Sequence, residues 1–184
     1  MRSLQEHFLI AMPAMADPNF RETVTYVCKH DADGAFGIIL NRPGELSVAE
    51  MLAQLALPLT DRARLDRPVV IGGPVEPERG FVLHKSTQAF DGTLTTAGDI
   101  KVTVSLDILA ALGRGDGPEP ALVALGYAGW GRGQLEAEIE QSSWLMVPAD
   151  PVIVFETPFE QRWAAALGLP GVDIRSITNY AGHA

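Results

Sequence analysis

The segment at residues 126–133 constrains the fold of this chain more than any other part of the sequence. It places four glycines in eight residues, beside Tyr127 and Trp130. The apolar run at 121–125 before it predicts a buried strand, and the pattern at 134–141 after it predicts a helix with one apolar face. We therefore expect a strand, a turn built from glycines and the beginning of a helix, in that order.

The acidic charge of the chain bears on its partners. The 184 residues have the length of one compact domain, and their composition, 47% hydrophobic and 20% charged, is that of a globular protein. The net charge of -9 argues against direct binding to nucleic acid, which requires clustered Lys and Arg. No apolar run is long enough to span a membrane. We expect a protein with no membrane segment that does not dock directly on DNA.

Strands and helices alternate irregularly along the rest of the pattern. Turn residues at 31–34 predict a hairpin, and Ser47 with Glu50, like Thr157 with Glu160, has the spacing of a capping box. Strands are expected at 8–11, 23–30, 35–40, 69–71, 81–84, 93–96, 101–104, 145–147 and 152–155. Further helices are expected at 48–57, 106–112 (ended by Gly113) and 158–167, and a helix-like turn at Asp17-Pro18. This order predicts a mixed sheet with helices packed on it.

Several motifs together resemble one known family. They are LIAMP at 9–13, DPNF at 17–20, GIILNRP at 37–43, GGPV at 72–75, FVLH at 81–84, the glycine segment at 126–138, SWL at 143–145 and GHA at 182–184. The set resembles the YqgE/AlgH family of bacterial proteins, in family order and over nearly the whole chain.

The resemblance implies a fold, a location and only a broad function. The implied fold is a single α+β domain over residues 1–184, with a branched mixed β-sheet folded into a pseudo-barrel and helices packed outside. The LIAMP motif belongs to the mature fold in this family, which implies a cytoplasmic protein rather than a signal peptide. Members are largely uncharacterised and are often described as transcriptional regulators, after a proposed role in alginate production. The resemblance supplies no catalytic residues.

One ligand site is suggested by motif chemistry. Backbone N–H groups at the beginning of a helix bind anions, and Arg42 at a strand end can bind a carboxylate or phosphate in a fork. If a pocket exists, we expect Arg42, the turn at 72–73 and the loop around Trp130 to meet there. The candidate ligand-binding residues are Asn41, Arg42, Gly72, Gly73, Trp130, Arg132 and Gln134. The alternative is structural, with the glycines permitting a tight turn and Arg42 in an internal ion pair.

The remaining reactive residue types show no spacing of a metal or catalytic site. The four histidines and the single cysteine lack metal-ligand spacing, so we predict no metal and no cofactor. His84 and Cys28 are expected in the core, with the reactivity of Cys28 left open. The glutamates at 136, 138 and 140 are expected to form a solvated stripe.

Two functions remain in competition. The first is a non-enzymatic cytoplasmic regulatory or interaction protein that acts through a protein partner, with an indirect effect on transcription. The alternative is a small-molecule or nucleotide-binding protein, or an enzyme, that uses the 126–133 loop and Arg42. A third hypothesis is that these motifs specify only the fold, while the function lies in loops. The sequence carries no signal for the oligomeric state.

Overall fold

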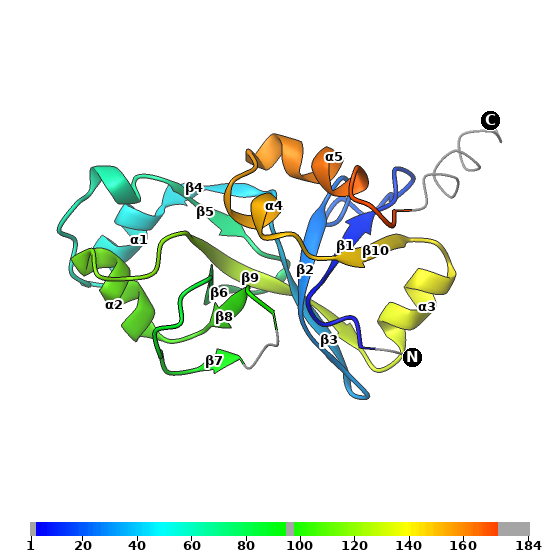
Figure 1. Ribbon diagram of the computed structural model, residues 1–184, viewed down its shortest axis with the longest axis horizontal. Coiled ribbons are helices and arrows are strands. Elements are labelled where there is room, and N and C mark those ends of the chain that lie inside the picture. The colour runs from blue at the N-terminus through cyan, green and yellow to red at the C-terminus, as the bar shows by residue number, and fades with distance from the viewer. Residues whose placement is uncertain (1–2, 95–97, 173–184) are drawn as a thin grey trace.

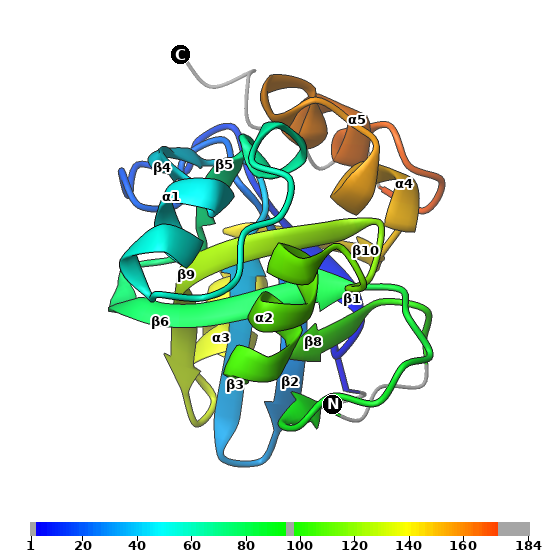
Figure 2. The same cartoon turned by 90° about the vertical axis from the view of Figure 1, so that its left-hand side faces the viewer.

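The computed structural model describes residues 3–94 and 98–172, which form a single α+β domain with helices packed around a curled, half-barrel sheet (Figures 1 and 2). The strands are β1 His7–Ala11, β2 Val24–Asp31, β3 Gly34–Ile39, β4 Pro43–Ser47, β5 Pro68–Ile71, β6 Val75–His84, β7 Thr93–Leu94, β8 Lys101–Thr103, β9 Ala121–Gly131 and β10 Trp144–Pro148. The α-helices are α1 Val48–Gln54, α2 Leu106–Arg114, α3 Gln134–Glu140, α4 Pro151–Phe155 and α5 Arg162–Leu167. Two short 3₁₀ helices cover Ala63–Leu65 and Phe159–Gln161.

The sheet branches at β9. Its main path runs β10-β1-β2-β3-β9-β6-β8-β7, and each pair of neighbours in this path is antiparallel. β5 lies off this path and is the third partner of β9: it pairs with β9 in parallel and with β4 in antiparallel orientation. Because β9 pairs with β3, β5 and β6, the branched mixed sheet expected from the resemblance is confirmed.

The glycine segment is mostly strand, so the predicted glycine turn was placed wrongly. β9 continues to Gly131, and only Arg132 and Gly133 form the turn that precedes α3. Gly126 has a φ of +74° at the point where β9 passes from β5 to β3. A Cβ there would lie 2.5 Å from the carbonyl oxygen of Gly73, so glycine lets the strand bend and cross closely.

Local signals placed α1 correctly and the end of α2 incorrectly. The capping box at Ser47 and Glu50 is present, and it begins α1. Gly113 does not end α2 but is buried inside it, whereas Gly115, with a φ of +84°, forms the left-handed cap. The prediction failed because two glycines lie close together and only tertiary packing distinguishes them.

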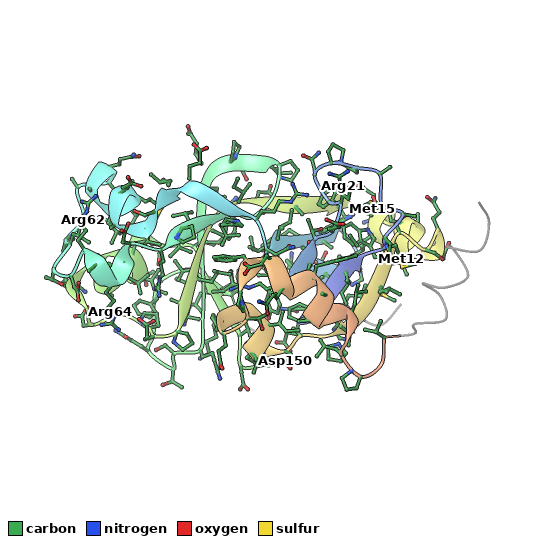
Figure 3. The ribbon with its side chains drawn as sticks, turned by 90° about the horizontal axis from the view of Figure 1, so that it is seen from above. Met12, Met15, Arg21, Arg62, Arg64 and Asp150 are labelled. Atoms are coloured by element: carbon green, nitrogen blue, oxygen red, sulfur yellow. The ribbon has the colours of Figure 1, made fainter. Side chains whose placement is uncertain are left out.

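The region after β10 differs most from the prediction. Residues 152–155 form α4 rather than a strand, because the Asp150 side chain accepts a hydrogen bond from Val152 N and Pro151 occupies the first turn (Figure 3). The capping box at Thr157 is absent, since the Thr157 hydroxyl donates to the Val152 carbonyl instead. Residues 159–161 are therefore 3₁₀, and α5 begins only at Arg162.

The N-terminal half follows the prediction more closely. β2 and β3 form the expected hairpin, with Asp31 opposite Gly34. The helix-like turn expected at Asp17-Pro18 is present as a single turn: the Asp17 side chain accepts from Asn19 N at 2.8 Å, and its carbonyl accepts from Phe20 N and Arg21 N at 3.0 and 2.8 Å. Two residues of the strand predicted at 93–96, and the GHA motif at 182–184, lie outside the described residues.

Three hydrophobic clusters fill the domain. The first lies under α4 and α5, the second under α1 and α2, and the third, around Trp130 and Trp144, under α3. Buried Arg162 joins α5 to the sheet: its Nη1 donates to the Leu40 carbonyl at 2.5 Å, and burial lowers its pKa to about 10. Within the described part of the chain, no helix is long and apolar enough to cross a membrane.

Candidate functional site

A cavity of about 470 Å³ opens between the β2–β3 hairpin and the strands β6 to β8. Figures 1 and 2 show the free end of the hairpin and β7 on the same side of the molecule. The cavity is lined by Lys29, Asp31, Asp33, Gly34, Ala35, Phe36, Arg79, Phe81, Leu94, Val104, Tyr127, Gly129 and Trp130. The cavity therefore lies between two arms of the curled sheet, one formed by β2 and β3 and the other by β6, β7 and β8.

Three aromatic rings form the floor of the cavity. Phe36, Phe81 and Tyr127 come from β3, β6 and β9, and their ring centroids lie 5.8–6.1 Å apart. The two contacts of Tyr127 are edge-to-face, an arrangement that favours aromatic packing. Burial, together with a hydrogen bond to Glu76, raises the pKa of Tyr127 above its ordinary value.

The space above this floor exists because one position on β9 has no side chain. Gly129 pairs with Phe36 across the β3–β9 ladder and lines the cavity. A Cβ at Gly129 would make only ordinary contacts, 3.4 Å from the Tyr127 ring. The backbone thus tolerates a larger residue here, and such a residue would occupy part of the cavity.

Charged residues of both signs surround the mouth of the cavity. Lys29 pairs with Asp31 at 2.7 Å, Arg132 with Asp33 at 3.1 Å, and Arg79 with Glu76 at 3.1 Å. The hydrogen bond within the first pair raises the pKa of Lys29 and lowers that of Asp31. The mouth therefore carries paired charges rather than a cluster of one sign.

Asn41 and Arg42 do not line this cavity. The Asn41 amide accepts from Val24 N at 3.0 Å and donates to the Glu22 carbonyl at 2.8 Å. Arg42 donates through Nη2 to the carbonyls of Pro18 and Arg21 at 2.9 and 3.1 Å. Both side chains hold the β1–β2 loop, which carries Met12, Met15 and Arg21 at the opposite end of the molecule from Arg62 and Arg64 (Figure 3).

The turn at Gly72 and Gly73 does not meet the loop around Trp130 in the cavity either. Gly72 and Gly73 pack against the backbone of β9 at Gly126 and Tyr127, without lining the cavity. Of the seven predicted ligand-binding residues, Trp130 alone is among the described residues that line it. The expected meeting of Arg42, Gly72, Gly73 and Trp130 in this cavity is not found.

Arg132 and Gln134 make local contacts near the turn that precedes α3. Arg132 is exposed and pairs with Asp33 on the neighbouring hairpin, at the edge of the cavity. Gln134 accepts from Gly131 N and donates to Glu138. These bonds tie the turn and the first residues of α3 together.

Comparison with known proteins assigns the chain to a family. A family model described as AlgH-like matches residues 8–175. The chain belongs to the AlgH-like family. A UPF0301 protein of Methylococcus capsulatus is 52% identical over 180 residues, covering 98% of this chain and 96% of that protein. A UPF0301 protein of Xanthomonas campestris is 47% identical over 181 residues, with the same coverage. The resemblance seen in the sequence motifs is thereby confirmed.

Two solved structures share the fold of this AlgH-like chain. The solution structure of the AlgH protein from Pseudomonas aeruginosa matches with a TM-score of 0.80 and 48% identity, covering 100% of this chain and 97% of that one. The crystal structure of a protein from Corynebacterium diphtheriae matches with a TM-score of 0.73 at 20% identity, over 94% and 91% of the two chains. At that lower identity, the second match shows the fold alone.

Of the three α3 glutamates expected in a solvated stripe, Glu140 is exposed, but Glu136 and Glu138 bind side chains of other elements. Oε2 of Glu138 accepts from the indole nitrogens of Trp130 and Trp144 at 2.9 and 2.8 Å. Glu136 accepts from Nε2 of His30, whose Nδ1 accepts from the backbone of Leu4. Sequence reasoning missed these roles because Trp144 and His30 reach α3 from separate strands.

Cys28 and His84 are buried, as predicted. Burial raises the pKa of the Cys28 thiol well above its ordinary range, which keeps it protonated. His84 contacts the Thr103 hydroxyl through Nε2 at 2.8 Å, but its buried Nδ1 has no hydrogen-bond partner among the described residues. His84 is thus a core residue with one of its two ring nitrogens hydrogen-bonded within the described part of the chain.

Proposed function

We propose that this AlgH-like chain is a non-enzymatic regulatory protein of the cytoplasm that binds a ligand in the aromatic cavity. The single observation that carries the proposal is the cavity itself, with three rings at its floor and paired charges at its mouth. Its volume falls within the range of about 300–1,000 Å³ that is typical of small-molecule sites.

The residues that line the cavity favour binding over catalysis. None of those described is His, Ser, Thr or Cys, the types that most often act as nucleophile or general base. The two lining carboxylates, Asp31 and Asp33, are each held by a cation. This arrangement can orient a ligand but offers no activated nucleophile.

The position of the cavity supports a regulatory role. A ligand would contact the β2–β3 hairpin and the β6–β8 strands at once, so its binding energy would favour one separation of the two arms over others. We propose that a protein partner recognises the ligand-bound separation of the two arms, and that any effect on transcription is indirect. The net charge of -9 supports a protein partner over direct contact with DNA.

A second candidate uses the residues predicted from motif chemistry. A nucleotide or other anion would bind at Arg42 and the glycine segment. The other residues predicted for this site are Asn41, Gly72, Gly73, Arg132 and Gln134. This role stays a prediction. The backbone contacts of Arg42 support a structural role instead, because a bound anion would have to compete with two carbonyls.

A ligand panel with two matched variants tests the proposal. Thermal unfolding would be measured with nucleotides, sugar phosphates, amino acids and small aromatic compounds. A ligand at about 100 times its dissociation constant adds roughly 2.7 kcal/mol, which corresponds to a shift of about 5–10 °C for a chain of this size. Gly129→Leu places a side chain in the cavity, whereas Gly131→Leu adds the same side chain to the same strand at a residue that does not line it.

The two variants separate the candidates. We expect a stabilising ligand whose effect is lost in Gly129→Leu and kept in Gly131→Leu. A hit that survives Gly129→Leu and is lost in Arg42→Ala would favour the second candidate. A panel in which every hit is indifferent to Gly129→Leu would refute binding in the cavity.

A further inference from the structure

The mouth of the cavity presents opposite charges side by side. Lys29 and Asp31 are two residues apart on β2, so their side chains lie on one face of the strand and meet at 2.7 Å. Their side chains are 60% and 39% exposed. Because exposed ion pairs contribute little to stability, a ligand that carries both charges can exchange partners with this pair at little cost.

The charges that line the cavity are balanced. Lys29 and Arg79 oppose Asp31 and Asp33, and each is also in an ion pair at the mouth. A phosphate or a carboxylate alone would leave the acids unpaired, and a simple amine would leave the bases unpaired. Charge complementarity therefore favours a ligand whose head group carries both signs and no net charge.

The floor favours an aromatic body on that ligand. A ring placed against Phe36 and Tyr127 would extend an existing set of ring contacts, while the Arg79 guanidinium lies over the Phe81 ring, 5.7 Å from its centroid. Leu94 and Val104 supply apolar walls beside it, and Val104 is 37% exposed. The lining thus combines an aromatic and aliphatic set with a set of charged side chains.

We propose that the ligand class of this cavity is a free aromatic amino acid. The ring lies on the aromatic floor, the ammonium group binds Asp31, and the carboxylate binds Lys29, with Arg79 on the opposite wall. The inference rests on the proposed function, since it names the ligand of the same cavity.

Four compounds of matched shape test the head group. Phenylalanine carries both charges, phenethylamine only the ammonium, 3-phenylpropionate only the carboxylate, and N-acetylphenylalaninamide neither. Each would be titrated into the ¹⁵N-labelled full chain while the backbone shifts of the cavity-lining residues are followed. We expect phenylalanine to bind more tightly than each of the other three by roughly two- to fivefold, the range expected for one exposed ion pair.

Two pairs of variants test the residues. Lys29→Gln and Asp31→Asn should each weaken the binding of phenylalanine by roughly two- to fivefold and leave the binding of N-acetylphenylalaninamide unchanged. Arg114→Gln and Asp116→Asn are the matched controls, because Arg114 and Asp116 form an exposed pair at 3.4 Å, also two residues apart, and neither lines the cavity. These controls should change neither affinity.

The possible outcomes distinguish this inference from the proposed function. If N-acetylphenylalaninamide shifts the cavity residues with the affinity of phenylalanine, the head-group assignment is wrong while ligand binding in the cavity stands. Tighter binding of a phosphate or nucleotide at the same residues would likewise overturn only the amino-acid assignment. If neither these compounds nor the wider panel shifts the cavity residues, both proposals fail.

Discussion

Replacing Glu138 by alanine should destabilise the protein by roughly 2–4 kcal/mol. One carboxylate oxygen accepts two indole N–H groups, from Trp130 at 2.9 Å and Trp144 at 2.8 Å, and the two residues are only 5% and 3% exposed. A hydrogen bond to a charged group contributes about 1.5–3 kcal/mol, so two would give about 3–6 kcal/mol. We lower this figure because Glu138 is partly exposed and water can replace part of what is lost.

Two further variants make the measurement specific. Glu140→Ala removes an exposed glutamate from the same helix and should change the free energy of unfolding by no more than about 0.5 kcal/mol. Glu138→Gln keeps an acceptor oxygen but loses the charge, so we expect less than half of the loss seen with alanine.

Guanidinium unfolding, followed by circular dichroism and tryptophan fluorescence, gives the free energies. Thermal midpoints should fall by roughly 5–15 °C for Glu138→Ala, since 1 kcal/mol corresponds to about 2–4 °C at this chain length. If Glu138→Ala proves as stable as Glu140→Ala, the carboxylate does not hold the two indoles and the argument is refuted.

Three other predictions follow from single residues. Burial lowers the pKa of His84 below 6.5, so the unfolded chain binds more protons than the folded one and the free energy of unfolding should fall as the pH drops below about 6.5. Urea titrations between about pH 5 and 7 should show this slope, and His84→Gln should flatten it. Arg42→Ala should cost about 1–2 kcal/mol, with faster hydrogen exchange at 14–22 and no change in ligand affinity at the cavity; loss of that affinity would contradict the structural role of Arg42. Arg162→Ala should cost roughly 2–4 kcal/mol in denaturant unfolding, because the carbonyls of Leu40 and Thr157 lose their donor, whereas exposed Arg114→Ala should have little effect.

Local signals in the sequence predicted the elements that depend on neighbours in the chain. The capping box of Ser47 and Glu50 and the β2–β3 hairpin were both found where the pattern placed them. The family motifs indicated the branched sheet. At 152–155, two local signals conflicted: the β-branched residues favoured a strand, but the Asp150 cap and Pro151 began a helix.

Strand pairing explains why the cavity could not be predicted. Phe36, Phe81 and Tyr127 are far apart in the sequence, and only the register of β3, β6 and β9 brings their rings together. Arg42 shows the opposite case. A cation at a strand end suggested a ligand, yet its guanidinium binds carbonyls of a loop that precedes β2 in the chain.

The segment that most constrains the fold also forms one wall of the candidate site, and the alternation of β9 explains how. Tyr127 and Gly129 lie on one strand face and line the cavity, whereas Ala128 and Trp130 contribute to the cluster under α3; Trp130 is also among the lining residues. Substitution of Gly129 should therefore change ligand binding more than stability, and substitution of buried Ala128 should do the reverse. The glycines and aromatics of this segment thus serve two purposes: Gly126 and Trp130 determine the path and packing of the strand, while Gly129 leaves the space that a ligand can occupy.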